Sequence, residues 1–224
     1  MTNPDVDVVV RPYQPMDRAQ VRRICWETGY MGEPADWFWR DLPSFADMFS
    51  GYYTDAEPES AFVVEIDGIV SGYLLGAVDT TKVWNPAKVL GRNIVRRGIA
   101  FRPGTGRFVW RMIGDGSVDL ATRKVKVSDL EFHQPEWPSH LHIDLLPIAR
   151  GHGAGRRLVS AWFDRLRAAG VTGCHLQTMA ENTSAIRFFE AVGFRPFESP
   201  VLVPGFRTRD GARLHLQAMV CEIS

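Results

Sequence analysis

A glycine-rich turn between an expected strand and an expected helix is the first feature of the sequence that could do chemistry. Residues 141–146 predict a strand that ends at Pro147, and the turn Arg150-Gly-His-Gly-Ala-Gly155 leads into an amphipathic helix that stops at Gly170. Such a turn directs free backbone N–H groups and the positive end of the helix dipole toward an anion. The turn is therefore a candidate phosphate site, although glycines at a helix start can also serve close packing alone.

Two common phosphate-binding motifs do not fit this turn. A P-loop requires GxxxxGK followed by serine or threonine, and the turn has neither a lysine nor a hydroxyl side chain in those places. A dinucleotide-binding fingerprint would need glycine at position 156, which is arginine, and a surrounding βαβ unit, which the sequence does not predict. The pattern that is present is Arg150-x-x-Gly153-x-Gly155.

A second motif follows farther along the chain. It reads Asn182-Thr-Ser-Ala185-Ile-Arg-Phe188-Phe189-Glu190-Ala-Val-Gly193-Phe194 and comes after an expected strand over residues 174–179. In this order and spacing, the two motifs resemble the R/Q-x-x-G-x-G/A and N-x-x-A-x-x-(F)-Y-E-x-x-G-F segments of the GCN5-related N-acetyltransferases (GNAT). The resemblance is close over about residues 140–224 and loose over about residues 7–79.

The resemblance implies a fold and a co-substrate. The expected fold is α+β, with a mixed, mostly antiparallel central sheet whose fourth and fifth strands splay apart, flanked by helices. Acetyl-CoA would place its pantetheine arm between those strands and its pyrophosphate on the turn. The coenzyme site that the resemblance implies consists of Leu145, Leu146, Arg150, Gly151, His152, Gly153, Ala154, Gly155, Arg156 and Asn182.

The implied reaction is transfer of an acetyl group to a primary amine of a small molecule or protein, by direct attack on the thioester. This transfer needs a neutral amine, so one base must remove the ammonium proton directly or through water. In the family that base commonly projects from the fourth strand. Here His140, His142 and Asp144 are spaced two apart and share one face of the strand.

We expect His142 to be the base, because histidine titrates closest to neutral pH. Asp144 would orient it or anchor the substrate ammonium group, and a strand bulge would shift either role to His140 or Ser139. Each polar residue could instead be structural. Two histidines and a carboxylate on one face could also bind zinc, but acetyl transfer needs no metal, so none is predicted.

One position departs from the family pattern. A tyrosine that protonates the leaving thiolate often precedes the position of Glu190, and this chain has Phe189 there. Phenylalanine cannot donate a proton. The alternative function is therefore a regulatory or scaffold module that binds acetyl-CoA with weak or lost catalysis.

A narrower resemblance concerns the segment Trp137-Pro-Ser-His-Leu-His-Ile-Asp-Leu-Leu-Pro147. It is similar to bacterial stand-alone relatives of the acetyltransferase-like domain of protein O-GlcNAcase. The eukaryotic domain is regarded as lacking cofactor residues, whereas this chain keeps the whole glycine turn.

The N-terminal part of the chain predicts a strand, helices and a hairpin. Alternating valines predict a strand near residues 6–10, and Asp17 is a plausible N-cap of the helix that follows. A helical stretch is expected over residues 36–49. Residues 61–66 and 69–78 flank Asp67-Gly68, a strong signal for a two-residue hairpin turn.

Residues 80–128 differ from the rest in composition, with eleven basic residues and only two acidic ones, Asp115 and Asp119. A helix is expected over residues 87–99. This basic insertion could recognise an acidic acceptor, pair with surplus acids elsewhere, or form a homodimer interface. Four aromatic residues suggest that one side of it is buried: Trp84, Phe101, Phe108 and Trp110.

Composition sets the remaining expectations. The 224 residues are 45% hydrophobic, and the 26 basic and 26 acidic residues cancel. Net charge therefore gives no reason to expect a dedicated nucleic-acid or membrane protein. We expect residues 1–224 to form a single GNAT domain, as a monomer or homodimer. Three cysteines without a paired spacing favour a reducing, cytoplasmic location, and no targeting segment is evident.

Overall fold

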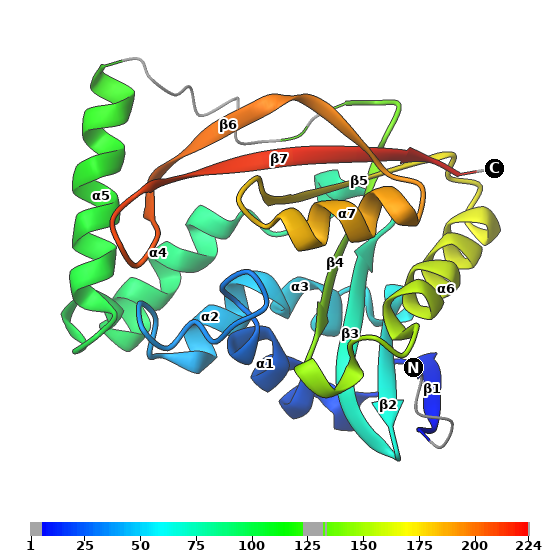
Figure 1. The fold of residues 1–224 in the computed structure, drawn as a ribbon. Helices are drawn as coiled ribbons and strands as arrows, with labels where there is room; N and C mark the ends of the chain where they lie inside the picture. Colours follow the sequence, from blue (N-terminus) through cyan, green and yellow to red (C-terminus); the bar gives the residue numbers. More distant parts are fainter. Residues whose placement is uncertain (1–5, 123–131, 133, 224) are drawn as a thin grey trace.

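The computed structural model describes residues 6–122, 132 and 134–223. Its strands form one sheet in the order β1-β2-β3-β4-β5-β7-β6, in which every neighbouring pair is antiparallel except β4 and β5 (Figure 1). This arrangement confirms the predicted α+β fold with a mixed, mostly antiparallel sheet. The strands are β1 (Val8–Pro12), β2 (Ala61–Ile66), β3 (Ile69–Ala77), β4 (Ser139–Leu145), β5 (Gly173–Met179), β6 (Arg195–Arg207) and β7 (Arg213–Glu222).

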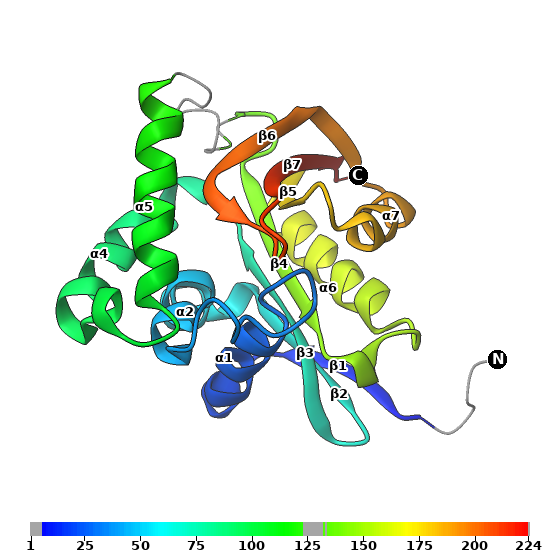
Figure 2. The same cartoon turned by 60° about the vertical axis from the view of Figure 1, so that its left-hand side comes forward.

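Helices cover both faces of the sheet (Figure 2). One apolar core joins β3 to helices near the N-terminus and in the insertion, through residues such as Ile24, Phe45 and Tyr73. The other lies under the two C-terminal helices and includes Leu158 and Trp162. The helices are α1 (Arg18–Glu27), α2 (Leu42–Phe49), α3 (Gly51–Asp55), α4 (Pro86–Arg97), α5 (Gly106–Ala121), α6 (Ala154–Ala168) and α7 (Thr183–Ala191). Within the described residues, no helix combines the length and apolar character needed to cross a membrane.

The hairpin between β2 and β3 has the predicted turn. Asp67 and Gly68 both adopt positive φ, at 50° and 77°, which is what a two-residue turn between twisted antiparallel strands requires. The turn fixes β2 beside β3, and β3 in turn pairs with β4. The Asp67-Gly68 turn thus helps to position β3, and β3 is the strand against which β4 pairs.

Two helix starts differ in part from the prediction. Asp17 occupies the predicted N-cap position of α1, but its side chain does not cap that helix. A short 3₁₀ turn over Pro15–Asp17 precedes α1, and the Asp17 carboxylate accepts from the N–H of Gln14 at 2.8 Å and from Arg11. The helix expected over residues 36–49 begins only at Leu42. There the Asp41 side chain accepts from the N–H of Ser44 at 3.0 Å and caps α2.

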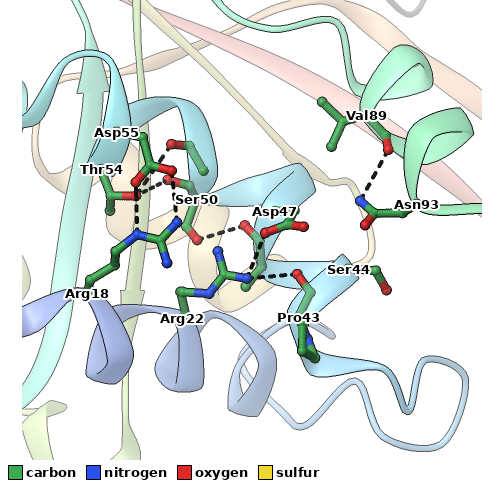
Figure 3. Close-up of polar contacts among 12 residues, drawn as sticks. Arg18, Arg22, Pro43, Ser44, Asp47, Ser50, Thr54, Asp55, Val89 and Asn93 are labelled. Atoms are coloured by element: carbon green, nitrogen blue, oxygen red, sulfur yellow. Dashed lines mark hydrogen bonds and ion pairs between the residues drawn. The ribbon is translucent and has the colours of Figure 1, made fainter. Parts of the chain in front are cut away.

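Ion pairs hold α1 against α2 and α3 (Figure 3). Arg22 reaches Asp47 at 2.7 Å and the carbonyl of Pro43 at 2.9 Å, and Arg18 pairs with Asp55 at 2.8 Å. These contacts hold α2 and α3 in place relative to α1. Both of those segments contact polar residues of β4, as described below.

The insertion contributes α4 and α5 between β3 and β4, and α5 packs on β6 at the edge of the molecule (Figure 1). The carboxylate of Asp115 pairs with Arg207 at 2.7 Å, and that of Asp119 pairs with Arg213. Gly205 permits this approach, because a Cβ there would lie 2.4 Å from the carbonyl oxygen of Met112. The α5 helix therefore joins the insertion to the C-terminal hairpin.

The prediction that four aromatic residues mark a buried side of the insertion was largely wrong. Phe108 is only 6% exposed, whereas Phe101, Trp110 and Trp84 are 82%, 55% and 39% exposed. Among the described residues, the expected pairing of insertion arginines with acids elsewhere occurs at one place, where Arg97 and Arg102 both bind Asp41. Composition showed that the segment is aromatic but not which of its faces is covered.

Candidate active site

The strands β4 and β5 begin side by side and then diverge. Their parallel pairing comprises Ser139 with Cys174 and His140 with His175. Beyond this point β4 continues along β3 as far as Leu145, while β5 continues along β7 as far as Met179 (Figure 1). The predicted splay is thus present, and the facing edges of the two strands are open to an extended ligand that can bond to backbone groups.

The glycine turn lies at the open end of β4 and leads directly into α6. Gly151 and Gly153 have φ values of 82° and 76°, and a Cβ added to either would find no atom within 4 Å. Gly153 is the N-cap of α6 and supplies no side-chain cap. The first N–H groups of a helix lack partners inside the helix, so those of α6 face a space in which backbone can approach a ligand closely.

Gly155 has a different role from the other two glycines. A Cβ there would lie 2.9 Å from Cζ of Phe188 and 3.4 Å from Cδ1 of Leu145. This glycine therefore lets the first turn of α6 approach α7 and the end of β4. The packing explanation of the glycines holds for Gly155, while Gly151 and Gly153 provide the open backbone.

The two arginines of the predicted coenzyme site bond to backbone carbonyl groups. Arg150 donates from Nε to the carbonyl of Leu145 at 3.0 Å and from Nη2 to that of Gly32 at 2.6 Å. Arg156 donates to the carbonyl of Ala191 at the end of α7, at 2.9 Å. A backbone carbonyl oxygen has two lone pairs, so the Leu145 carbonyl can accept a second hydrogen bond while it holds Arg150.

The other predicted coenzyme residues surround the same turn and opening. Leu146 donates its N–H to the carbonyl of Ser71 at 2.9 Å, His152 is half-buried in the turn, and Ala154 is buried at the start of α6. Asn182 is the N-cap of α7 and accepts from the N–H of Ala185 at 3.2 Å. It also borders a pocket of about 300 Å³, whose other lining residues are Tyr30, Met31, Glu33, Glu181, Thr183 and Ser184.

The polar residues of β4 face the N-terminal helices, as their spacing predicts. The register with β3 runs without interruption from His140 opposite Ala77 to Leu145 opposite Gly72, so no bulge changes the facing of His142 or Asp144. The intervening Leu141, Ile143 and Leu145 pack in or against the core on the opposite face. Ser139 is fully buried and donates to the carbonyl of Gly173 at 2.8 Å, which gives it a structural role.

His142 and Asp144 form a pair. Nε2 of His142 lies 3.3 Å from Oδ2 of Asp144, and Nδ1 lies 3.3 Å from the carbonyl oxygen of Phe49 at the end of α2. Burial lowers the pKa of His142, but the charge and hydrogen bond of Asp144 and the Phe49 carbonyl outweigh burial and leave the pKa above its usual value. The imidazole side chain is 35% exposed, so a substrate can reach it.

His140 differs from His142 although it lies on the same face. Its Nε2 bonds to the Tyr53 hydroxyl and its Nδ1 lies 3.2 Å from the Thr80 hydroxyl. Burial and the nearby His175 and His142 lower the pKa of His140 to about 3. A neutral imidazole with both nitrogens engaged is a poor base, so the geometry favours His142 over His140.

Tyr73 is a site residue that the sequence did not reveal. It lies on β3 directly opposite Asp144, and its hydroxyl donates to Oδ2 of Asp144 at 2.5 Å. Burial and the Asp144 charge raise the pKa of Tyr73 well above its usual value, which keeps the hydroxyl protonated as a donor. Alternation along β3 could have placed Tyr73 on this face, but only the register with β4 shows its partner.

Phe189 lies on α7 and is buried in the core that α7 shares with α6. It is only 6% exposed, and its ring centre lies 5.3 Å from that of Phe188 and 5.9 Å from that of Phe194. The position therefore offers no proton donor, as its side chain indicates. Within the residues that the structure describes, no group of three or more His, Cys, Asp and Glu side chains is arranged to hold a metal ion.

The fold and the site correspond to known acetyltransferases. Residues 130–194 match the model of the acetyltransferase (GNAT) family. The crystal structure of SsHAT is 28% identical to this chain over 97% of it and 99% of SsHAT, with a TM-score of 0.69. Two structures that are 16% identical also share the fold: yncA from Salmonella typhimurium with its cofactor acetyl-CoA, and the ribosomal-protein-S18-alanine N-acetyltransferase from Escherichia coli.

The latter two alignments cover 97% of this chain, with 94% of yncA at a TM-score of 0.57 and 95% of the Escherichia coli enzyme at 0.53. In this chain the splayed strands β4 and β5 lie next to the glycine turn before α6, on a mixed sheet. Residues 130–194 are thus similar to the acetyltransferase (GNAT) family, and the fold of the whole described chain is similar to that of SsHAT.

Replacing Tyr73 with phenylalanine is expected to lower kcat about tenfold, because Asp144 loses the donor that orients it toward His142. The KM for acetyl-CoA should not change, since the ring stays in the core. Tyr53→Phe is the matched control, because it removes a buried hydroxyl from the same face that bonds to His140 instead. Equal losses of kcat in steady-state assays of the two variants would contradict the role given to Tyr73.

Proposed function

We propose that this acetyltransferase moves the acetyl group of acetyl-CoA to a primary amine of a small molecule or protein, with His142 as the base. The observation that carries the base assignment is the His142–Asp144 pair beside the opening between β4 and β5. His142 would take the ammonium proton directly or through one water. Asp144 would hold the imidazole in place and stabilise its protonated form.

The coenzyme would be held by backbone rather than by charge. Its pyrophosphate would accept hydrogen bonds from the N–H groups of His152, Gly153, Ala154 and Gly155, where the dipole of α6 favours negative charge. The pantetheine arm would lie along the end of β4 at Leu145 and Leu146 and pass Asn182. Arg150 and Arg156 would act mainly through the shape of the turn, because both hold carbonyl groups of neighbouring segments.

The chemistry requires no metal, so we propose none. The leaving thiolate would take its proton from water, because Phe189 provides no hydroxyl. Slow turnover is the specific expectation from that substitution, and complete loss of turnover would favour the alternative of a module that binds acetyl-CoA without catalysis.

The narrower assignments rest on sequence features. The segment over residues 137–147 supports a relationship to bacterial relatives of the acetyltransferase-like domain of protein O-GlcNAcase. The three free, buried cysteines are compatible with a reducing, cytoplasmic location. We further propose that residues 1–224 act as one GNAT domain, with residues 80–128 as its insertion.

The direct test is thiol release from acetyl-CoA across a panel of amines, with mass spectrometry of the acceptor to show the acetyl group. The panel should include polyamines, amino sugars, amino acids and peptides with free N-termini or lysines. Acceptor-dependent thiol release supports the proposal. Tight acetyl-CoA binding without acetylation of any acceptor would support the non-catalytic alternative.

The pH dependence of the reaction offers a prediction that is specific to the His142–Asp144 pair. A base must be unprotonated, so kcat/KM should rise with pH through the raised pKa of His142. Asp144→Asn removes the negative charge that raises this pKa and leaves burial, which lowers it, opposed only by the weaker effect of the Phe49 carbonyl. The acidic limb should therefore move about one pH unit lower, while the maximal rate falls.

Histidine NMR titration and the pH–rate profile of the Asp144→Asn variant measure this shift independently. A limb that stays in place, or moves to higher pH, would show that another group titrates in the profile.

A further inference from the structure

The outer surface of the insertion carries half of the exposed large hydrophobic residues in the described part of the chain. Twelve such residues are exposed, and six of them lie between positions 95 and 120. Isolated exposed apolar side chains are normal, but a contiguous cluster marks an interaction site. We refer to the four of them that are linked by a ring contact or by helical spacing as the insertion patch: Phe101, Trp110, Ile113 and Leu120.

The centre of the insertion patch follows a helical seam on α5. Trp110, Ile113, Ser117 and Leu120 are spaced three and four apart alternately, which is the spacing of the contact positions in paired helices. Phe101 packs edge-on against Trp110, with ring centres 6.3 Å apart. Next to the seam, a Cβ on Gly114 would meet no atom within 4 Å, so a second helix can approach the backbone there.

The charges around the insertion patch are of one sign. The two acidic residues of the insertion face inward and pair with Arg207 and Arg213, and two of its arginines are held by Asp41. Within the described residues, the remaining basic side chains of α4 and α5 form no ion pair. They are Lys88, Arg92, Arg96, Arg107 and Arg111, and all five are exposed. Arg111 lies over the Phe108 ring, 5.7 Å from its centre.

We propose that the insertion patch binds an acidic amphipathic helix of another protein. The apolar face of that helix would cover Trp110, Ile113 and Leu120, and its carboxylates would reach the flanking arginines. A second copy of this chain fits poorly, because two patches facing each other would bring like charges together, and both acids of the described part of the insertion are already paired. Because the seam is narrow and follows one helix, a single partner helix fits it better than a partner with a broad, flat surface.

The apolar seam and the arginines would contribute differently. Burial of Trp110 and its neighbours supplies most of the affinity, because buried aromatic side chains dominate such contacts. The arginines select partners of negative charge and speed association, an effect that salt weakens. The proposal is independent of catalysis, because the insertion patch contains none of the residues placed in the coenzyme or amine site.

The test uses the full chain and a synthetic helical peptide of three heptads, with leucine at the two contact positions and glutamate at the flanking ones. A twin peptide carries lysine in place of glutamate. Isothermal titration calorimetry should show the glutamate peptide binding at least about tenfold more tightly than the lysine peptide at low salt. That preference should shrink about threefold or more when salt is raised to 0.5 M.

Two double variants test the two contributions separately. Ile113→Ser with Leu120→Ser should weaken binding of the glutamate peptide at least about tenfold. Arg107→Glu with Arg111→Glu should reverse the preference, so that the lysine peptide binds more tightly. Met16→Ser with Ile69→Ser is the matched control, because these residues are also exposed apolar side chains but lie outside the insertion patch. All changed side chains are exposed, and thermal unfolding checks that each variant is folded.

Four results would overturn the proposal. The first is equal affinity for the two peptides, and the second is no binding of either. The third is binding of phosphatidylserine vesicles or duplex DNA, lost in the arginine variant, when the glutamate peptide does not bind. The fourth is a dimer in sedimentation experiments that disappears in Ile113→Ser with Leu120→Ser, which would identify a second copy as the occupant.

Discussion

Replacing His142 with alanine is expected to reduce kcat by about 10²–10⁴-fold, the usual contribution of a positioned base. The imidazole lies 3.3 Å from Asp144 and is accessible, whereas the neighbouring His140 is neutral with both ring nitrogens engaged. Acetyl-CoA affinity should stay unchanged, since the turn and α6 do not contact His142. The remaining rate should rise with pH, because the amine then loses its proton without help.

Steady-state assays with an established acceptor, together with calorimetry with acetyl-CoA, measure both effects. His140→Asn is the comparison variant, and we expect it to lower kcat far less than His142→Ala. A larger loss in the His140 variant would place the base at His140 and would contradict the roles inferred from their hydrogen bonds.

The second large effect is expected at Gly153. Its φ of 76° is unfavourable for a β-branched residue, so Gly153→Val should force the backbone before α6 to change. The N–H groups proposed to bind the pyrophosphate would then lose their alignment. We expect acetyl-CoA affinity to fall about 100-fold or more, which corresponds to about 2.7 kcal/mol.

Gly68→Val provides the matched control, since Gly68 has a φ of 77° and equally open surroundings at the tip of the β2–β3 hairpin. Both substitutions should lower thermal stability, but only Gly153→Val should weaken binding in calorimetry. Unchanged affinity of a folded Gly153→Val protein would exclude the turn as the pyrophosphate site.

Features encoded by neighbouring residues could be predicted from the sequence. The Asp67-Gly68 hairpin depends on two residues that tolerate positive φ, and the glycine turn before α6 depends on a short run of letters. The common face of His140, His142 and Asp144 follows from the period of a strand. Where a short segment alone decides the backbone, the prediction was confirmed.

Features that depend on distant segments could not be predicted in the same way. Tyr73 meets Asp144 only because β3 and β4 adopt one register, although the whole insertion separates them in the sequence. Likewise, no local pattern indicates that Arg150 reaches the carbonyl of Gly32. Asp17 lies at the predicted N-cap position of α1, but its position in the sequence does not show that its carboxylate binds Arg11 instead of the helix end.

The attachment of α5 to β6 has a mechanical consequence. The two halves of the sheet are joined by the short pairing of β4 with β5, which comprises only two residue pairs. In the sequence, α5 lies between β3 and β4, on one side of that junction. Its residues Asp115 and Asp119 form ion pairs with arginines of β6 and β7, on the other side. It thus acts as a strut between the two walls of the opening, and an enzyme trimmed of the insertion would keep its strands but lose control over the width of its own active site.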